Sequence, residues 1–168
     1  MLAWWDRIER WAIGLIGAAA LLICLWQIVG RYISNELSLP WGEELSVYMI
    51  VWAAFLTASA LVRDDGHVRA DLLMRMLSPA RQRWLEVVNC TIALVFCAGL
   101  AWYGWIVTVD AYELGEASNT MLRFPMWIYY ACLPAGAVLM TLRYAARLYR
   151  FTLQFDPNQM SVHSGRES

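Results

Sequence analysis

Charged residues are distributed unevenly along the chain and leave long apolar stretches between them. No Asp, Glu, Lys or Arg occurs within residues 11–30, 45–62, 87–109 and 124–142. Each stretch holds about twenty residues, the length at which a helix crosses about 30 Å of hydrocarbon. Backbone amides find no water inside a bilayer, so each stretch is expected to be α-helical. The pattern predicts an all-α integral membrane protein with four transmembrane helices, at about 11–33, 43–62, 84–109 and 125–148.

The polar segments between and after these stretches also carry predictions. Apolar residues recur at helical spacing within 68–77, among Arg69, Asp71 and Arg75, which predicts a short amphipathic helix on the bilayer surface between helices two and three. Residues 156–168 lack an apolar run and are expected to form a disordered tail after a membrane domain at 1–155. The first stretch is longer than a signal-peptide core, so we expect a retained helix.

Arginine placement predicts the orientation. All thirteen basic residues are arginines, and all but Arg31 and Arg123 lie in the N-terminal segment, in the loop 63–84 or after residue 142. Basic residues gather on the cytoplasmic side of membrane proteins. Both termini and the loop 63–84 are therefore expected to be cytoplasmic.

Composition narrows the function classes. The chain is 60% hydrophobic and 16% charged, against roughly 45–50% and about 25% in soluble domains. Its ten Trp and eight Tyr suit the membrane–water interface. A net charge of −1 indicates no basic surface for nucleic acid. The four cysteines lie in apolar stretches without a C-x-x-C motif, which favours small buried side chains over a metal site or disulfide.

The apolar stretches contain no ionisable side chain besides cysteine and tyrosine. Ion-coupled carriers place Asp, Glu, Lys, Arg or His at membrane depth to hold ions or protons, so this chain alone does not fit that class or a small multidrug carrier. Neither histidine lies in a stretch, and no nucleophile–base pair occurs. We expect an accessory membrane subunit that is not an enzyme and has no cofactor. A four-helix redox protein that uses its cysteines or a quinone is the alternative.

The second expected helix begins with two neighbouring carboxylates, Glu43 and Glu44, just before its charge-free stretch. A carboxylate in the first turn of a helix meets the positive end of the helix dipole, which stabilises it by about 0.3–1 kcal/mol. This explains one glutamate better than a pair, so an ion pair or a partner contact stays open. Tyr48, Trp52 and Phe55 follow as an aromatic stripe that faces either lipid or a partner subunit.

Small residues four apart suggest where helices approach closely. Gly14 and Ala18 are spaced in this way in the first helix, and Ala54 and Ala58 in the second. Such pairs allow close backbone contact between membrane helices.

Several short motifs carry a family resemblance. They are Arg31, Pro40-Trp41-x-Glu43-Glu44, Tyr48, Trp52, Gly66-His67-Val68-x-x-Asp71, Trp102-Tyr103-Gly104, Pro125-Met126-Trp127, Tyr130, Pro134, Gly136 and Arg143. In this order and spacing, residues 11–147 resemble the DctQ-like family, the small membrane subunits of tripartite ATP-independent periplasmic (TRAP) transporters.

The resemblance implies a location and partners. It implies a multi-pass subunit of the bacterial cell inner membrane that scaffolds a large membrane subunit, carried on a separate chain. That large subunit would import a carboxylated organic solute, driven by sodium and delivered by a periplasmic solute-binding protein. The small subunit would not bind the solute itself.

Eight residues are candidate contacts with the large subunit or the binding protein: Arg31, Glu43, Glu44, Tyr48, Trp52, His67, Asp71 and Arg123. Glu43 and Glu44 could pair with Arg31, with the large subunit or with the binding protein, or serve helix placement alone. His67 and Asp71 either contact the large subunit or cap the loop. Arg123 anchors the outer end of the fourth helix or helps to dock the binding protein.

Overall fold

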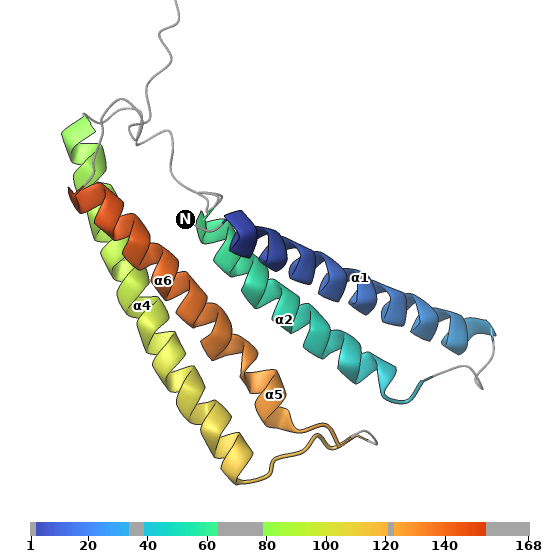
Figure 1. Cartoon of the computed structure of the whole chain (residues 1–168). Coiled ribbons are helices and arrows are strands. Elements are labelled where there is room, and N and C mark those ends of the chain that lie inside the picture. Colours follow the sequence, from blue (N-terminus) through green and yellow to red (C-terminus); the bar gives the residue numbers. More distant parts are fainter. Residues whose placement is uncertain (1–2, 34–38, 64–78, 121–122, 154–168) are drawn as a thin grey trace, which may run out of the picture.

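The computed structural model describes residues 3–33, 39–63, 79–120 and 123–153, which are all-helical apart from turns and one isolated β-bridge. The helices are α1 (Ala3–Ile33), α2 (Gly42–Arg63), α4 (Pro79–Glu113), α5 (Met126–Tyr130) and α6 (Cys132–Leu153) (Figure 1). The amphipathic helix expected at 68–77 and the tail 156–168 lie outside the described residues.

Three of the expected membrane spans correspond to long apolar helices. By length and composition, Arg7–Ile33, Gly42–Val62 and Arg81–Glu113 can each cross a membrane. They belong to α1, α2 and α4, and both α1 and α4 continue beyond the charge-free stretches. At 1.5 Å per residue, the 35 residues of α4 extend about 52 Å, well over the hydrocarbon thickness of about 30 Å.

The fourth expected span, 125–148, is divided into two helices. α5 ends at Tyr130 and α6 begins at Cys132, with Ala131 between them in a helical conformation. Pro134 has no amide hydrogen to donate to the carbonyl of Tyr130, which interrupts the helix at this point. α6 is not among the described helices that are long and apolar enough to qualify as spans.

The long helices form an open layer rather than a closed bundle. α2 packs against α1 and α6, and α4 packs against α6 and α5, so the order is α1, α2, α6, α4 (Figure 1). α1 and α4 are the two edges and expose large apolar side chains, among them Leu15, Leu22, Ile92 and Phe96. We call one end of the layer the loop end (the ends of α1 and α4 and the starts of α2 and α5). The opposite end, where α6 ends, is the arginine end.

The chain turns back sharply after α4. Gly115 takes a positive φ of 62°, and the amides of Gly115 and Glu116 bond to carbonyls in the last turn of α4 at 3.2 and 3.0 Å. This is a Schellman cap, which favours glycine because a side chain is strained at positive φ. The amide of Ser118 then donates to the carbonyl of Phe124 at 2.9 Å. The Thr120 hydroxyl in this segment donates to Glu44, so the segment lies beside the start of α2.

The closest contacts between helices occur at Gly136 and Gly104, and not at Gly14, where the sequence predicted one. A Cβ on Gly136 of α6 would lie 2.8 Å from Cβ of Phe55 on α2, and one on Gly104 of α4 would lie 3.1 Å from Leu133. A Cβ on Gly14 would meet nothing within 4 Å. The close approach expected around Gly14 and Ala18 is thus absent among the described helices, because α1 turns this face outward.

The cysteines lie largely as expected. Cys90, Cys97 and Cys132 are buried and Cys24 is half-buried, and all four are free thiols. The three buried thiols take the place of small apolar side chains, and that of Cys90 also lies 4.0 Å from a carboxylate oxygen of Glu86.

Candidate functional site

An exposed ion pair joins α1 to α2 at the loop end. The guanidinium of Arg31, in the last turn of α1, pairs with the carboxylate of Glu43, and their side chains are 68% and 69% exposed. One turn earlier, the side-chain amide of Gln27 donates to the carbonyl of Leu39. Gln27 also lies where a Cβ of Gly42 would be. The first turn of α2 is thereby held against the end of α1.

Glu44 faces the opposite side, toward the segment that follows α4. Its carboxylate accepts a hydrogen bond from the Tyr48 hydroxyl at 2.5 Å and another from the Thr120 hydroxyl. The hydroxyls of Thr120 and Ser118 lie 2.8 Å apart. The two neighbouring glutamates therefore have different roles: Glu43 joins α2 to α1, and Glu44 joins α2 to the loop between α4 and α5.

The aromatic stripe of α2 packs inside the chain. The ring of Tyr48 lies 4.8 Å from that of Tyr129 and 5.2 Å from that of Phe124. The indole of Trp52 donates to the carbonyl of Ile128 at 3.1 Å. Each of the three side chains of the stripe is half-buried against the chain's own helices and keeps part of its surface exposed. They dock α5 and α6 onto α2.

A hollow of about 630 Å³ opens beside these contacts. We call it the polar hollow because of the carboxylates in its lining, although apolar side chains, among them Val47 and Met126, form much of its wall. It is lined by Glu43, Glu44 and Glu116 and by the polar side chains of residues 118–120. Arg123, whose φ is 45°, lines a smaller adjoining hollow with Ser118 and Thr120. At the loop end, the structure thus pairs Arg31 with Glu43, while Glu44 and exposed Arg123 lie toward the segment that follows α4.

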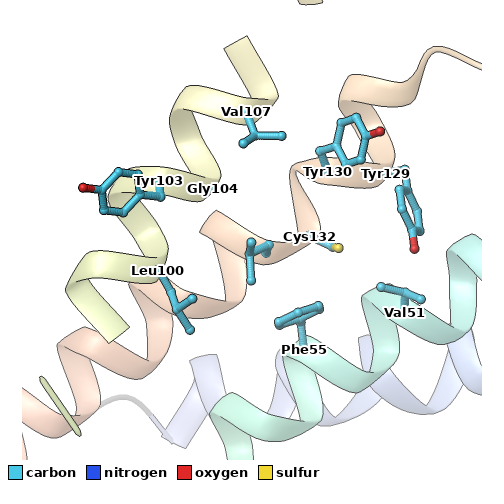
Figure 2. Close-up of a pocket in the computed structure, with 10 residues that line it drawn as sticks. Val51, Phe55, Leu100, Tyr103, Gly104, Val107, Tyr129, Tyr130 and Cys132 are labelled. Carbon is cyan, nitrogen blue, oxygen red and sulfur yellow. The ribbon is translucent and has the colours of Figure 1, made fainter. Parts of the chain in front are cut away.

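An apolar cavity of about 300 Å³ lies deeper between α2, α4 and the junction of α5 with α6. Figure 2 shows Val51 and Phe55 on one side of this space, Leu100 and Val107 on another, and Tyr130 near the junction.

Two buried ion pairs secure the arginine end. Arg143 of α6 pairs with Glu9 of α1, and Arg147 pairs with Glu86 of α4 at 2.5 Å. In each pair the glutamate side chain is 5% exposed and the arginine 15%. Arg143 and Arg147 lie one turn apart, so a single face of α6 reaches both edge helices.

Sequence reasoning did not select these four side chains as site residues. Glu9 and Glu86 lie just outside the charge-free stretches. For Glu86, the sequence does contain a sign of burial. It lies on the same helix face as Cys90 and Cys97, which are buried.

Arg83 adds a polar contact at the same end. It donates to the main-chain carbonyls of Phe151 and Thr152 at 2.9 and 2.5 Å. Carbonyls in the last turn of a helix have no partner within the helix, so α4 caps α6. His67 and Asp71, which were expected near this end, lie outside the described residues.

The described residues hold no group of three or more His, Cys, Asp or Glu side chains arranged to bind a metal ion. The polar residues of both ends connect helices to one another. The arrangement is suited to fixing helix positions and presenting surfaces.

Sequence comparisons identify related proteins. The family described as "Tripartite ATP-independent periplasmic transporters, DctQ component" matches residues 20–153. The C4-dicarboxylate TRAP transporter small permease protein DctQ of Rhodobacter capsulatus is 28% identical over 138 residues, covering 82% of this chain and 58% of that protein. The Vibrio cholerae protein of the same name is 29% identical over 161 residues, covering 83% and 68%. This chain therefore spans less than two thirds of the R. capsulatus relative.

A longer protein also contains a similar region. The sialic acid TRAP transporter permease protein SiaT of Haemophilus influenzae is 29% identical over 146 residues, which cover 83% of this chain but 22% of that protein. In SiaT, a region similar to this chain is thus part of a much longer polypeptide.

Proposed function

Since the chain belongs to the family of DctQ components of tripartite ATP-independent periplasmic (TRAP) transporters, we propose that this small permease subunit scaffolds a separate large membrane subunit in a bacterial inner membrane. The match over residues 20–153 is the observation that carries the proposal. The similarity to a small part of SiaT supports it, because one polypeptide there combines this region with a longer one.

The open layer of helices supports a scaffolding role. Each edge helix has one packed flank, and its other flank exposes large apolar side chains such as Leu22 on α1 and Phe96 on α4. Exposed apolar area of this kind suits contact with lipid or with other membrane helices. A large subunit packed against one of these surfaces would be held by a layer that is itself fixed at both ends by ion pairs.

We further propose four membrane crossings, with α5 and α6 together forming the fourth. The arginine end then faces the cytoplasm and the loop end faces the periplasm, following the arginine distribution. Asn119→Cys at the loop end should react with a membrane-impermeant maleimide in intact cells. Arg81→Cys at the other end should react only after permeabilisation. The reverse pattern would contradict this orientation.

The transported solute is proposed to be a carboxylated organic compound. The relatives are named for C4-dicarboxylates and sialic acid, and both are carboxylic acids. In this proposal a periplasmic binding protein delivers the solute, a sodium gradient drives its uptake, and the large subunit holds both the solute and sodium sites.

The loop-end residues are proposed to position the periplasmic surface of the complex. Arg31, Glu43 and Arg123 are exposed there, where they can contact the large subunit or the binding protein. Tyr48 and Trp52 would act indirectly by holding α5. His67 and Asp71 remain candidate contacts on the cytoplasmic side.

Co-purification with a tagged large subunit and solute uptake by whole cells test the scaffolding role. The double variant Glu43→Gln, Glu44→Gln should lower both co-purification and uptake, because it removes one ion pair and weakens the contact to Thr120. Glu113→Gln, an exposed change at the same end of the layer, is the matched control. The proposal fails if the two chains do not co-purify, or if this chain alone drives sodium-dependent uptake in liposomes.

A further inference from the structure

We propose that this protein binds one phospholipid with an amine headgroup, placing an acyl chain in the apolar cavity and the headgroup in the polar hollow. This inference goes beyond scaffolding, which does not require a bound lipid. It begins from the position of Tyr130, which lines both spaces. The apolar cavity therefore adjoins a hollow whose lining combines carboxylates with apolar side chains.

The apolar cavity opens sideways from the layer. Its floor includes Gly104 and Cys132, which are buried, whereas Tyr103 and Val107 on α4 are 71% and 49% exposed. In Figure 2 the ring of Tyr103 points away from the neighbouring helices. A cavity with an apolar floor and an open side on a membrane-spanning helix faces the acyl chains of the bilayer.

The depth of the cavity matches the upper part of an acyl chain. Val51 and Phe55 lie seven and eleven residues beyond Glu44 on α2, or about 10 and 16 Å along the helix. The headgroup layer is about 5–8 Å thick on each side of the hydrocarbon core. A lipid whose headgroup lies at Glu44 thus has its first acyl carbons at the level of the cavity.

The charge of the polar hollow selects the headgroup. Three carboxylates line it, those of Glu43, Glu44 and Glu116, and the nearby cation Arg31 is paired with Glu43. An ammonium group is attracted to such a surface, whereas a headgroup that carries only a phosphate is not. Exposed Arg123 in the adjoining hollow supplies positive charge for the phosphate. A zwitterionic aminophospholipid is complementary to both.

Native mass spectrometry of the delipidated full chain tests the proposal with two defined lipids, palmitoyl-oleoyl phosphatidylethanolamine and phosphatidylglycerol. We expect the ethanolamine lipid to bind at one site and at least fivefold more tightly than the glycerol lipid. Val107→Trp fills the mouth of the cavity and should weaken this binding at least fivefold. The matched control is Val95→Trp on the same helix, since Val95 is 65% exposed and lines neither space; it should bind like the wild type.

A second variant separates headgroup from acyl recognition. Glu43→Gln, Glu44→Gln should retain lipid binding but lose the preference for the ethanolamine headgroup. Equal affinity of the wild-type chain for both lipids would overturn the proposal, as would unchanged binding in Val107→Trp. If Val107→Trp prevents co-purification with the large subunit but leaves lipid binding intact, the cavity receives a partner side chain and the lipid proposal is wrong. Because lipid binding is measured on the isolated chain, its failure leaves the scaffolding role untouched.

Discussion

Replacing Gly136 with alanine should destabilise the contact between α2 and α6. A Cβ at this position would lie 2.8 Å from Cβ of Phe55 and 3.2 Å from its carbonyl oxygen. Neither atom can move away by a side-chain rotation, so the two helices must separate. Overpacking of this kind costs about 1–3 kcal/mol.

Gly14→Ala is a matched control because it makes the same chemical change inside a helix without a steric conflict. A Cβ on Gly14 meets nothing within 4 Å. Alanine gains up to about 1 kcal/mol of helix propensity over glycine at either site, and this gain cancels when the two variants are compared. The remaining difference is the overpacking cost of about 1–3 kcal/mol at Gly136.

Thermal unfolding in detergent, followed by tryptophan fluorescence, measures this difference. In chains of 150–250 residues, a loss of 1 kcal/mol in unfolding free energy typically lowers the melting temperature by about 2–4 °C. Gly136→Ala should therefore melt several degrees below Gly14→Ala. Adding Phe55→Leu should not restore the loss, because leucine keeps the Cβ and the carbonyl. Equal melting temperatures for the two alanine variants would show that α2 and α6 are not this close.

Three further changes test other contacts by the same melting assay. Arg147→Met should lower the free energy of unfolding by about 3–5 kcal/mol, because it leaves the buried carboxylate of Glu86 uncompensated. The control Arg150→Met changes an exposed arginine and should lower it little. Similar losses in the two variants would contradict the burial of the Arg147–Glu86 pair. Gly115→Ala should lower the free energy of unfolding by about 1 kcal/mol, because a side chain is strained at the φ of 62° found there. An unchanged melting temperature would argue against the Schellman cap. Arg31→Gln should lower the free energy of unfolding by less than about 1 kcal/mol, because its ion pair with Glu43 is exposed. A larger loss would indicate that the pair is shielded from solvent.

The spacing of charges along the chain was sufficient to predict three long helices. α1, α2 and α4 each contain one charge-free stretch, and the requirement to satisfy backbone amides in lipid determines their structure. The fourth prediction treated 125–148 as continuous although Pro134 lies within it. A proline in a membrane helix can be accommodated as a kink or divide the helix, and its neighbours decide between these outcomes.

The candidate site was predictable only where its contacts are local. Arg31 and Glu43 lie at the facing ends of consecutive helices, and their pairing was one of the alternatives that the sequence left open. Glu44 bonds to Thr120, which is 76 positions away. Glu9 and Arg143 are separated by 134 positions. Contacts at such separations depend on which helices become neighbours, and helical periodicity does not contain that information.

The position of α6 between α2 and α4 affects the order in which the protein can assemble. α6 is synthesised after the other three long helices, yet it occupies an interior place in the layer and provides the principal packing partner of α4. During translation, α4 therefore lacks its principal packing partner until α6 has been made. α6 provides that partner, and its Arg143 and Arg147 pair with Glu9 of α1 and Glu86 of α4. Assembly of the whole layer is thereby delayed until ribosomes have completed nearly all of the described chain.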